Sequence, residues 1–448
     1  MTDEARAGFR RKTLWPLIWP LLVCGLLTMG AAMADTFLVS AYAPELAATV
    51  SMGNQILGVA YDLSGLLAVG ALVMIAQALG AGKIRRARRI GWLAIGGSAM
   101  FNAAIALVLV GCAPWFVVWT NTPEEIRAAT EVYVRLTAVS LVGNGVIVAA
   151  SAMLRGFGHT VEILVLGVVA NGVYLLLEYG LIFGAWGLPE LGVVGAALSS
   201  VLVRALGVGV ILFLLARKVG GWRIRWRGWH AGGVWRKLLR LSFPSVGENV
   251  VYDVYQLLMV SLIAALGTAS VLMRSYALTV SSLLSLVVFT VAQGNETLVG
   301  YDRGGGNLEM ARRRAERTAL WTGLGTMLLA GVLYFAAESL LGLFTQDPEV
   351  IAGGKMLLLI TVCMQPFQAG ATILLAALRA VGDVWVPVGW SLAATWLVAL
   401  PAGFGAVEIG GWGVAGLWWS VTLGEAVKCL VLAVRWHRMR WAEKPVAG

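Results

Sequence analysis

Twelve apolar segments, each long enough to cross a lipid bilayer as a helix, dominate this sequence. A membrane-spanning helix needs about 20 mostly apolar residues. Such segments form two groups of six, at 14–38, 50–79, 90–118, 130–153, 162–183 and 191–216, and at 241–266, 271–299, 318–344, 351–378, 384–405 and 412–434. The loops between them are short, so 448 residues leave no room for a sizeable extra domain. The pattern predicts an all-α integral membrane protein with twelve transmembrane helices.

The composition excludes several other classes of protein. Apolar residues make up 59% of the chain and charged residues 13%, whereas a soluble protein is nearer one half and one quarter. Such a chain cannot cover a water-facing surface, which excludes a soluble enzyme, a disordered chain and a fibrous repeat. The four cysteines lie in separate apolar stretches, so we expect neither disulfides nor a metal site. We also expect no enzyme and no cofactor, because the spans hold no clustered catalytic set and the chain no nucleotide-binding motif.

Basic residues gather in alternate loops. They lie before the first span and at 83–89, 217–240, 303–317 and 435–444, whereas the remaining loops at 40–49, 120–129, 184–192 and 345–350 are acidic or neutral. Lys and Arg accumulate on cytoplasmic loops. We therefore predict a multi-pass protein of the inner or plasma membrane with both termini cytoplasmic, and we read the net charge of +10 as this bias rather than as a nucleic-acid partner. Tryptophans near span ends are expected to anchor the membrane interface, namely Trp15, Trp19, Trp115, Trp119, Trp412 and Trp436.

The two groups of six spans are related by an internal duplication. Four motifs recur at an offset of 224, and Gly192-x-x-Gly195 recurs as Gly413-x-x-Gly416 at 221. The four pairs are Pro20 and Pro244, 80–82 and 304–306, 87–89 and 311–313, and 154–158 and 378–382. Because six is even, both halves enter the membrane from the same side, so the repeats are parallel. We predict two six-helix lobes in a V-shaped arrangement, at 1–218 and 241–448, joined by a basic cytoplasmic linker at 219–240.

Acids inside the first-half spans are the most informative polar residues, because an ionisable group in a membrane is costly and usually functional or paired. Asp35 and Glu178 both fall in the outer half of their spans. Asn171, Tyr174 and Glu178 are spaced i, i+3, i+7 and so share one helical face. Two acids held together in a membrane can exchange protons in the working range. The alternative interpretation is a structural polar network, with Asp35 acting only as a cap for the next segment.

The second half carries a different set of polar residues near its cytoplasmic ends. Glu248 follows Pro244 by four residues, and a polar stripe adjoins its face. These side chains either line a central cleft for a cationic substrate or brace the cytoplasmic gate. We expect Glu425 and Lys428, spaced i, i+3, to neutralise each other, and Arg204 to pair with a carboxylate. The candidates for the cleft or gate are Glu248, Tyr252, Tyr255, Asp253, Gln256 and Glu296, with Asp62 as a weaker one.

Several strings resemble the multidrug and toxic compound extrusion (MATE) family, over essentially the whole chain. They include LRGFGHT (154–160), NGVYLLLEYGLIFG (171–184) and LGVVGAALSSVLVR (191–204), with the second-half counterpart LRAVGDVWVP (378–387). The resemblance implies an antiporter that expels small organic cations or amphipathic compounds in exchange for H⁺ or Na⁺ by alternating access of two lobes. We expect it to act as a monomer in the lipid bilayer.

The polar first-half site resembles that of the DinF-like branch of this family. The resemblance implies that Asp35 and Glu178 are the coupling acids, that Tyr174 stands where the family has Asn, and that Ser199 or Ser200 stands where it has Thr. Glu178 itself replaces the usual Asp. A phenol offers one oxygen and more bulk than an amide, so a tight Na⁺ cage is harder to build, and we predict H⁺ coupling with Na⁺ as the alternative.

Two further expectations concern the rest of the chain. The resemblance implies that Pro20 is the point at which the first helix bends, and the absence of an acid beside Gln365 and Gln368 argues against a coupling site in the tenth span. The alternative function is a lipid-linked precursor flippase. Flippases commonly present a basic cavity to pyrophosphate, whereas the intramembrane charges here are mostly acidic, although Arg204 and Arg274 keep this alternative open.

Overall fold

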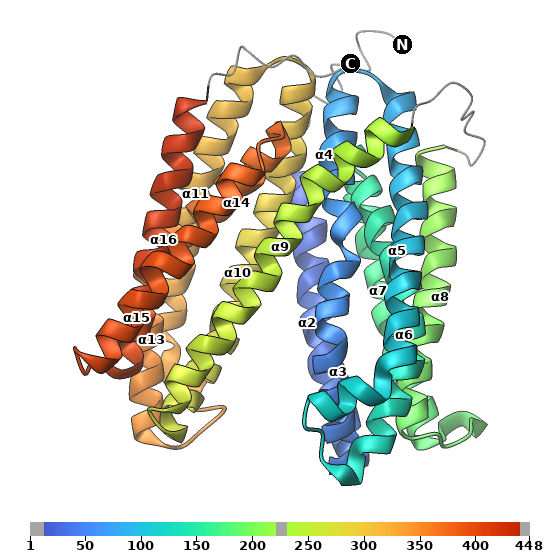
Figure 1. Cartoon of the computed structure of the whole chain (residues 1–448), viewed down its shortest axis with the longest axis vertical. Coiled ribbons are helices and arrows are strands. Elements are labelled where there is room, and N and C mark those ends of the chain that lie inside the picture. Colours follow the sequence, from blue (N-terminus) through green and yellow to red (C-terminus); the bar gives the residue numbers. More distant parts are fainter. Residues whose placement is uncertain (1–12, 221–230, 440–448) are drawn as a thin grey trace. The chain divides into compact units, whose positions relative to one another are not determined.

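The structure is a computed structural model that describes residues 13–220 and 231–439, and this part of the chain is helical without strands (Figure 1). The helices of the first half are α2 (Trp15–Tyr42), α3 (Pro44–Ser64), α4 (Leu66–Gly80), α5 (Ile84–Trp119), α6 (Glu124–Phe157), α7 (Thr160–Phe183) and α8 (Val193–Lys218), with a short 3₁₀ helix, η1 (Ala185–Gly187). Those of the second half are α9 (Ala231–Ala264), α10 (Thr268–Gly304), α11 (Leu308–Phe335), α12 (Ala337–Leu341), α13 (Pro348–Val381), α14 (Trp385–Ala394), the π-helical turn η2 (Thr395–Ala399), α15 (Leu400–Glu408) and α16 (Gly413–Arg438).

Eleven helical stretches in the described ranges are long and apolar enough to cross a membrane. α3 and α4 together form one of them, and α14 to α15 form another. α9 is not among the eleven and carries five charged residues, but its 34 residues are ample for a span. Counting α9, each half supplies six long helical segments, as the apolar segments predict.

Two compact units divide the chain. One comprises Trp15–Leu79 and Lys83–Val246, and we call it the first lobe; the other consists mainly of Gly247–Gly448, and we call it the second lobe. The boundary falls inside α9, close to Pro244. The expected linker at 219–240 lies partly outside the described residues, and its last ten residues, 231–240, form the first turns of α9.

The repeated sequence motifs are helix ends in both halves. Gly158 and Gly382 follow α6 and α13 with φ of 76° and 93°, a left-handed conformation that glycine adopts without strain. In each case the next residue's amide donates back to the leucine of the Leu-Arg-x-x-Gly motif, from His159 to Leu154 and from Asp383 to Leu378. This is the Schellman helix stop. α6 and α13 have the same length, 34 residues, so the duplication fixes where these helices end.

The second glycine of the repeated Gly-x-x-Gly motif, Gly195 or Gly416, allows close packing. A Cβ at Gly195 would lie 2.4 Å from the carbonyl oxygen of Leu181, and a Cβ at Gly416 would lie 2.9 Å from Cβ of Ala406. These contacts join the last two helices of each half. Any side chain would force the backbones apart, which explains why the Gly-x-x-Gly pattern occurs at the same place in both halves.

The loop expected at 40–49 is almost absent, which is a correction to the sequence-based prediction. α2 ends at Tyr42 and α3 begins at Pro44, so only Ala43 separates them. Ala43 is extended, with φ −161° and ψ 139°. Proline at the first position of a helix has the required φ and needs no hydrogen-bond acceptor for an N–H. The polar residues that suggested a loop therefore form the first turns of α3.

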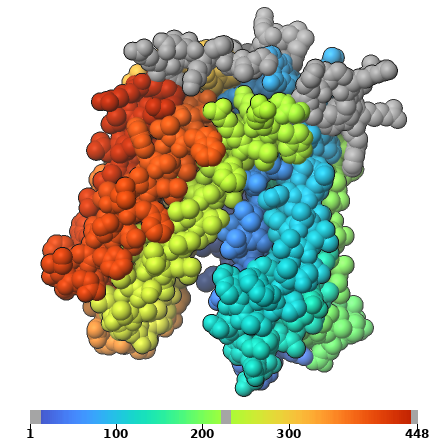
Figure 2. Space-filling model, in the orientation of Figure 1, coloured from blue at the N-terminus to red at the C-terminus, as the bar shows by residue number. Residues whose placement is uncertain are grey.

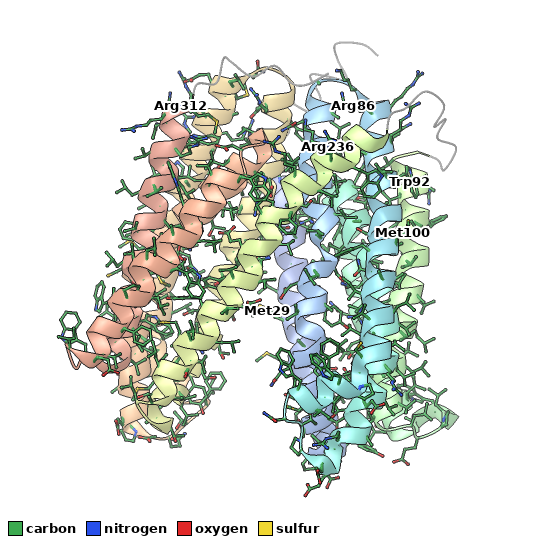
Figure 3. All side chains as sticks on the ribbon, in the orientation of Figure 1. Met29, Arg86, Trp92, Met100, Arg236 and Arg312 are labelled. Atoms are coloured by element: carbon green, nitrogen blue, oxygen red, sulfur yellow. The ribbon has the colours of Figure 1, made fainter. Side chains whose placement is uncertain are left out.

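The outer faces of the helices carry large apolar side chains. Met100, midway along α5, points away from the bundle and is 76% exposed (Figure 3). Figure 2 shows the side chains of α5 and α6, drawn in cyan, and of α9, drawn in yellow-green, on the viewed face. Many basic residues instead lie near helix ends: Arg86, Arg236 and Arg312 lie near the starts of α5, α9 and α11 (Figure 3), and Arg155, Arg217 and Arg303 lie in the last turns of α6, α8 and α10. This distribution fits helices whose middles contact lipid.

Candidate functional site

The candidate site lies between α2 and α7, which pack against each other in the first lobe (Figure 1). Two hydrogen bonds cross between the middle parts of these helices. The Asn171 amide donates to the Thr28 hydroxyl (3.3 Å), and the Tyr174 hydroxyl donates to Asp35 Oδ1 (2.6 Å). The spacing of Asn171, Tyr174 and Glu178 places all three on the face of α7 that meets α2.

A single phenolic hydroxyl lies between two carboxylates. Tyr174 contacts Asp35 Oδ1 at 2.6 Å and Glu178 Oε1 at 3.1 Å. Both carboxyl groups therefore lie within a few ångströms of one oxygen, and Asp35 and Glu178 interact electrostatically. A hydroxyl carries one proton and so can donate fully to only one of the two acids. We call these three residues the acid cluster.

The acid cluster contains a buried carboxylate oxygen that has no hydrogen-bond donor among the described residues. Glu178 is 1% exposed, and within the described ranges its Oε2 atom has no hydrogen-bond donor. Asp35 is half-buried. Neither acid forms an ion pair with a described residue, because the ion pairs of the first lobe lie elsewhere. A buried charge without a partner is costly. A bound proton would neutralise one carboxylate and supply the donor that Glu178 Oε2 lacks, and a bound cation would balance the negative charge.

The polar residues around the acid cluster belong to other helices of the first lobe. Tyr133 of α6 is buried and donates to Asn54 of α3 (3.2 Å). The Arg204 guanidinium lies over the ring of Tyr61, 5.2 Å from its centroid. Ser200 is buried, but we find no hydrogen bond from its side chain to the acid cluster in the described part of the chain; its carbonyl accepts from Arg204 (3.4 Å). The assignment of Ser200 to ion coupling stays a prediction.

Pro20 lies inside α2 without ending it. Proline has no N–H, so the carbonyl four residues earlier, at Pro16, loses its helical donor. The structure supplies another, because the hydroxyl of Thr160, the first residue of α7, donates to the Pro16 carbonyl oxygen (3.1 Å). Thr160 is 3% exposed. Sequence reasoning included Thr160 in the string LRGFGHT but gave it no role, since only the folded chain places it beside Pro16.

Thr160→Val is therefore expected to weaken the first lobe. Valine has nearly the same shape but no hydroxyl, and a buried carbonyl that loses its donor costs about 1–3 kcal/mol. Thermal unfolding of the purified protein in detergent measures the effect. Thr36→Val is the matched control, because the exposed Thr36 hydroxyl donates only within its own helix, to Ala32 (3.0 Å). Equal unfolding temperatures for the two variants would contradict the role of Thr160.

In the second lobe, the structure connects several of the expected cleft or gate residues to one another. The Ser391 hydroxyl of α14 donates to Glu248 Oε1 (2.6 Å). The rings of Tyr252 and Tyr255 are 5.8 Å apart, and the Gln256 amide donates to the Tyr252 hydroxyl (3.4 Å). Sequence spacing indicated the shared face on α9 but not Ser391, which lies 143 residues away.

The remaining candidates make other contacts, although Arg379 links Glu296 to Glu248 and Asp253 interacts electrostatically with Tyr252. Glu296 of α10 is 4% exposed and lies 3.4 Å from Arg379 Nε of α13, so it braces these two helices. Asp253 and Asp62 are exposed on α9 and α3. Gln365 donates to Gln368 within α13 (2.9 Å). No group of three or more His, Cys, Asp or Glu side chains in the described residues is arranged to hold a metal ion.

In the described ranges, twelve long helical segments form two lobes, and one buried and one half-buried acid lie between two helices of the first lobe. This is the architecture of a multi-pass membrane transporter. The sequence pattern of the MatE family matches residues 20–179 and 244–404, one block in each half. The chain therefore belongs to the MATE family of multidrug efflux transporters, and it is not an enzyme. This confirms the family resemblance and the two-lobed all-α fold, whereas the DinF-like branch stays a prediction.

Three relatives illustrate the match. The uncharacterized transporter YisQ of Bacillus subtilis strain 168 is 27% identical over 437 residues, which cover 97% of this chain and 96% of YisQ. The probable multidrug resistance protein NorM of Thermotoga maritima is 27% identical over 412 residues, 91% of this chain and 88% of NorM. A crystal structure of a mutant of the Vibrio cholerae MATE transporter VcmN superposes with a TM-score of 0.88 at 20% identity, over 97% of this chain and 98% of VcmN.

Proposed function

We propose that this protein exports small organic cations or amphipathic compounds in exchange for protons, and that the protons bind at Asp35, Tyr174 and Glu178. The observation that carries the proposal is the position of the Tyr174 hydroxyl between two carboxylates, one of which is buried with an oxygen that lacks a donor. A proton added to this cluster neutralises one acid and supplies the missing hydrogen bond, so binding and release of one proton changes the contact between α2 and α7.

The chemistry of the cluster favours H⁺ over Na⁺. A hard cation in a protein is held by several oxygen atoms. Here the phenolic proton points toward the acids, and the carboxylates come from only two helices. Ser200, which the family resemblance suggests as a further oxygen ligand, makes no hydrogen bond to the cluster in the described residues. Protonation needs no such cage, so a proton fits this site with fewer ligands.

Alternating access would connect this site to export. Protons arriving from outside would bind the acid cluster, reshape the first lobe around α2 and lower the affinity for the transported compound, which would then leave. Acidic side chains occur in the spans of both lobes, and the half-buried Glu248 in the second lobe suits a cationic substrate. The plasma membrane, with both termini in the cytoplasm, is the location that the distribution of basic residues supports.

The test uses the purified full-length protein in sealed liposomes. Efflux of the fluorescent cation ethidium is measured under an imposed pH gradient and, separately, under a Na⁺ gradient at uniform pH. We expect the pH gradient alone to drive efflux above the rate in protein-free liposomes. Efflux driven only by Na⁺ would overturn the choice of ion, and no ethidium efflux together with translocation of a fluorescent lipid-linked pyrophosphate would favour the flippase alternative.

Tyr174→Phe is expected to slow proton-driven ethidium efflux about tenfold without uncoupling it. The change removes a hydrogen bond to charged groups, worth about 1.5–3 kcal/mol, but both acids that bind the proton remain. The number of protons exchanged per ethidium, measured from the pH gradient that balances a known ethidium gradient, should be unchanged. Tyr179→Phe on the same helix is the control, because the Tyr179 side chain is exposed. A loss of coupling in Tyr174→Phe would show that the phenol itself carries the proton.

A further inference from the structure

An ion pair that is largely shielded from solvent lies in the second lobe, within the long helix α16. Lys428 Nζ lies 2.8 Å from Glu425 Oε1, and each side chain is only 12% exposed. With a rise of 1.5 Å per residue, the pair lies roughly 20 Å from the start of α16, and Lys428 lies roughly 15 Å from the end of the helix at Arg438, within the apolar segment 412–434. An ammonium at this depth is costly, and the Lys428 side chain extends to Glu425 rather than to a helix end.

The ammonium of Lys428 faces a group of acidic and aromatic side chains from other helices. It lies 5.9 Å from the centroid of the Tyr252 ring of α9, within the range of a cation–π contact. Glu248, also on α9, is within electrostatic reach of both Lys428 and Glu425. A single lysine therefore lies among two carboxylates and the negative face of an aromatic ring.

Other ionisable groups also lie near this pair. Tyr255 and Asp253 of α9 and Arg274 of α10 interact electrostatically with Tyr252. Arg379 of α13 interacts with Glu248, and Cys429 of α16 interacts with Glu425. α14 and η2, which pack on α16, contain no ionisable residue, and α15 contains only Glu408 at its end. Within the described residues, Lys428 is thus the one cation that forms an ion pair with Glu425.

The two lobes neutralise their buried acids differently. The acid cluster of the first lobe has no ion pair among the described residues, so its counter-charge has to come from the medium. The residues that correspond to Asp35 and Glu178 at the 224-residue offset are Met259 and Ala402. In the second lobe, Glu425 lies on α16, and the Lys428 ammonium on the same helix balances its charge.

We propose that Lys428 is a built-in counter-ion that occupies the place of an exchangeable cation in the second lobe, so that ions from the medium bind only at the acid cluster of the first lobe. The second half of this statement rests on the proposed function. The first half predicts that removing Lys428 leaves Glu425 without its ion-pair partner, so that Glu425 then requires a proton or Na⁺.

The experiment measures apparent unfolding temperatures of the full-length protein in detergent, at about pH 5.5 and about pH 8, without any transported compound. In Lys428→Met, Glu425 must keep a proton to stay buried. We expect its unfolding temperature to fall between the two pH values by about 3 °C or more beyond the fall of the parent protein. Added Na⁺ at the higher pH should restore part of this loss if the cation can replace the proton.

Two companion variants keep the test decisive. Glu425→Gln leaves the ammonium without its partner, so its extra pH effect should have the opposite sign, and this variant carries the test if Lys428→Met does not fold. The double variant Glu425→Gln with Lys428→Met should return to the parental pH profile, because buried ion pairs can often be replaced without loss of stability. Arg313→Met is the control for an exposed pair, since Arg313 and Glu309 are 67% and 63% exposed.

A merely structural ion pair would give a different result. If Lys428→Met and Glu425→Gln both lower the unfolding temperature equally at the two pH values and with or without Na⁺, the built-in counter-ion is excluded. The assay contains no gradient and no substrate, so it does not depend on proton-driven export. Failure of the proposed function would instead be seen as unchanged transport in variants of the acid cluster.

Discussion

Replacing Glu178 with glutamine is expected to reduce pH-gradient-driven efflux of ethidium to the level of protein-free liposomes. Glutamine keeps the shape of the side chain, so its Oε1 can still accept from Tyr174 and its amide can donate toward Asp35. It cannot bind and release a proton. The glutamine amide would therefore act as a permanent hydrogen-bond donor in the acid cluster. The first lobe would then have no proton-binding step for the pH gradient to drive.

Glu162→Gln is the matched control for this variant. Glu162 lies on the same helix as Glu178 but pairs with Lys218 (3.0 Å) near the start of α7, away from Asp35. It should retain most of the parental efflux. Unfolding temperatures of both variants close to that of the parent would separate a coupling defect from a folding defect. Parental efflux in a well-folded Glu178→Gln protein would exclude Glu178 as the proton-binding acid.

The sequence predicts the number of spans and the residues of the acid cluster, because both depend on local periodicity. Apolar runs of about 20 residues define helices whatever their neighbours. The spacing of Tyr174 and Glu178 places them one turn apart on any helix. Their meeting with Asp35 on α2 depended on matching depths in two spans that start from the same side, which the basic loops indicate.

Contacts between distant segments could not be predicted in this way. The Thr160 hydroxyl reaches the Pro16 carbonyl 144 residues earlier, and Ser391 reaches Glu248 across 143 residues. Neither Thr160 nor Ser391 lies at a helical spacing from its partner, so local periodicity cannot indicate the contact. Trp436 was expected at the membrane interface because it lies near a span end, but it is fully buried against α11 and α13 residues such as Ala315 and Leu378. Distance from a helix end says nothing of which face a side chain occupies.

Helix boundaries were also shifted where polar residues continue a helix beyond its apolar part. α6 runs from Glu124 to Phe157, whereas the apolar segment covers only 130–153. Its first turn is acidic, with Glu124 and Glu125, which suits the positive end of the helix dipole. Hydropathy measures the part of a helix in lipid, so it cannot detect turns that extend into water.

Asp35→Asn is expected to make ethidium binding independent of pH. An asparagine resembles a protonated aspartate, since it is uncharged and its amide can donate to Glu178 Oε2, the oxygen without a donor. If protons weaken ethidium binding, the variant should bind ethidium as weakly at about pH 8 as the parent does at about pH 5.5, a difference on the order of tenfold. Ethidium fluorescence with the purified protein in detergent measures these affinities.

The same coupling requires a reciprocal result in the parent protein. A proton that weakens ethidium binding must itself be displaced when ethidium binds. Protons released on ethidium addition, measured with a pH-sensitive dye in weak buffer, should therefore be present in the parent and absent in Asp35→Asn. Asp35→Glu keeps an acid at this position and should retain both the pH dependence and the proton release. If Asp35→Asn releases as many protons as the parent, the exchangeable proton binds elsewhere, and the acid cluster serves only to hold α2 against α7.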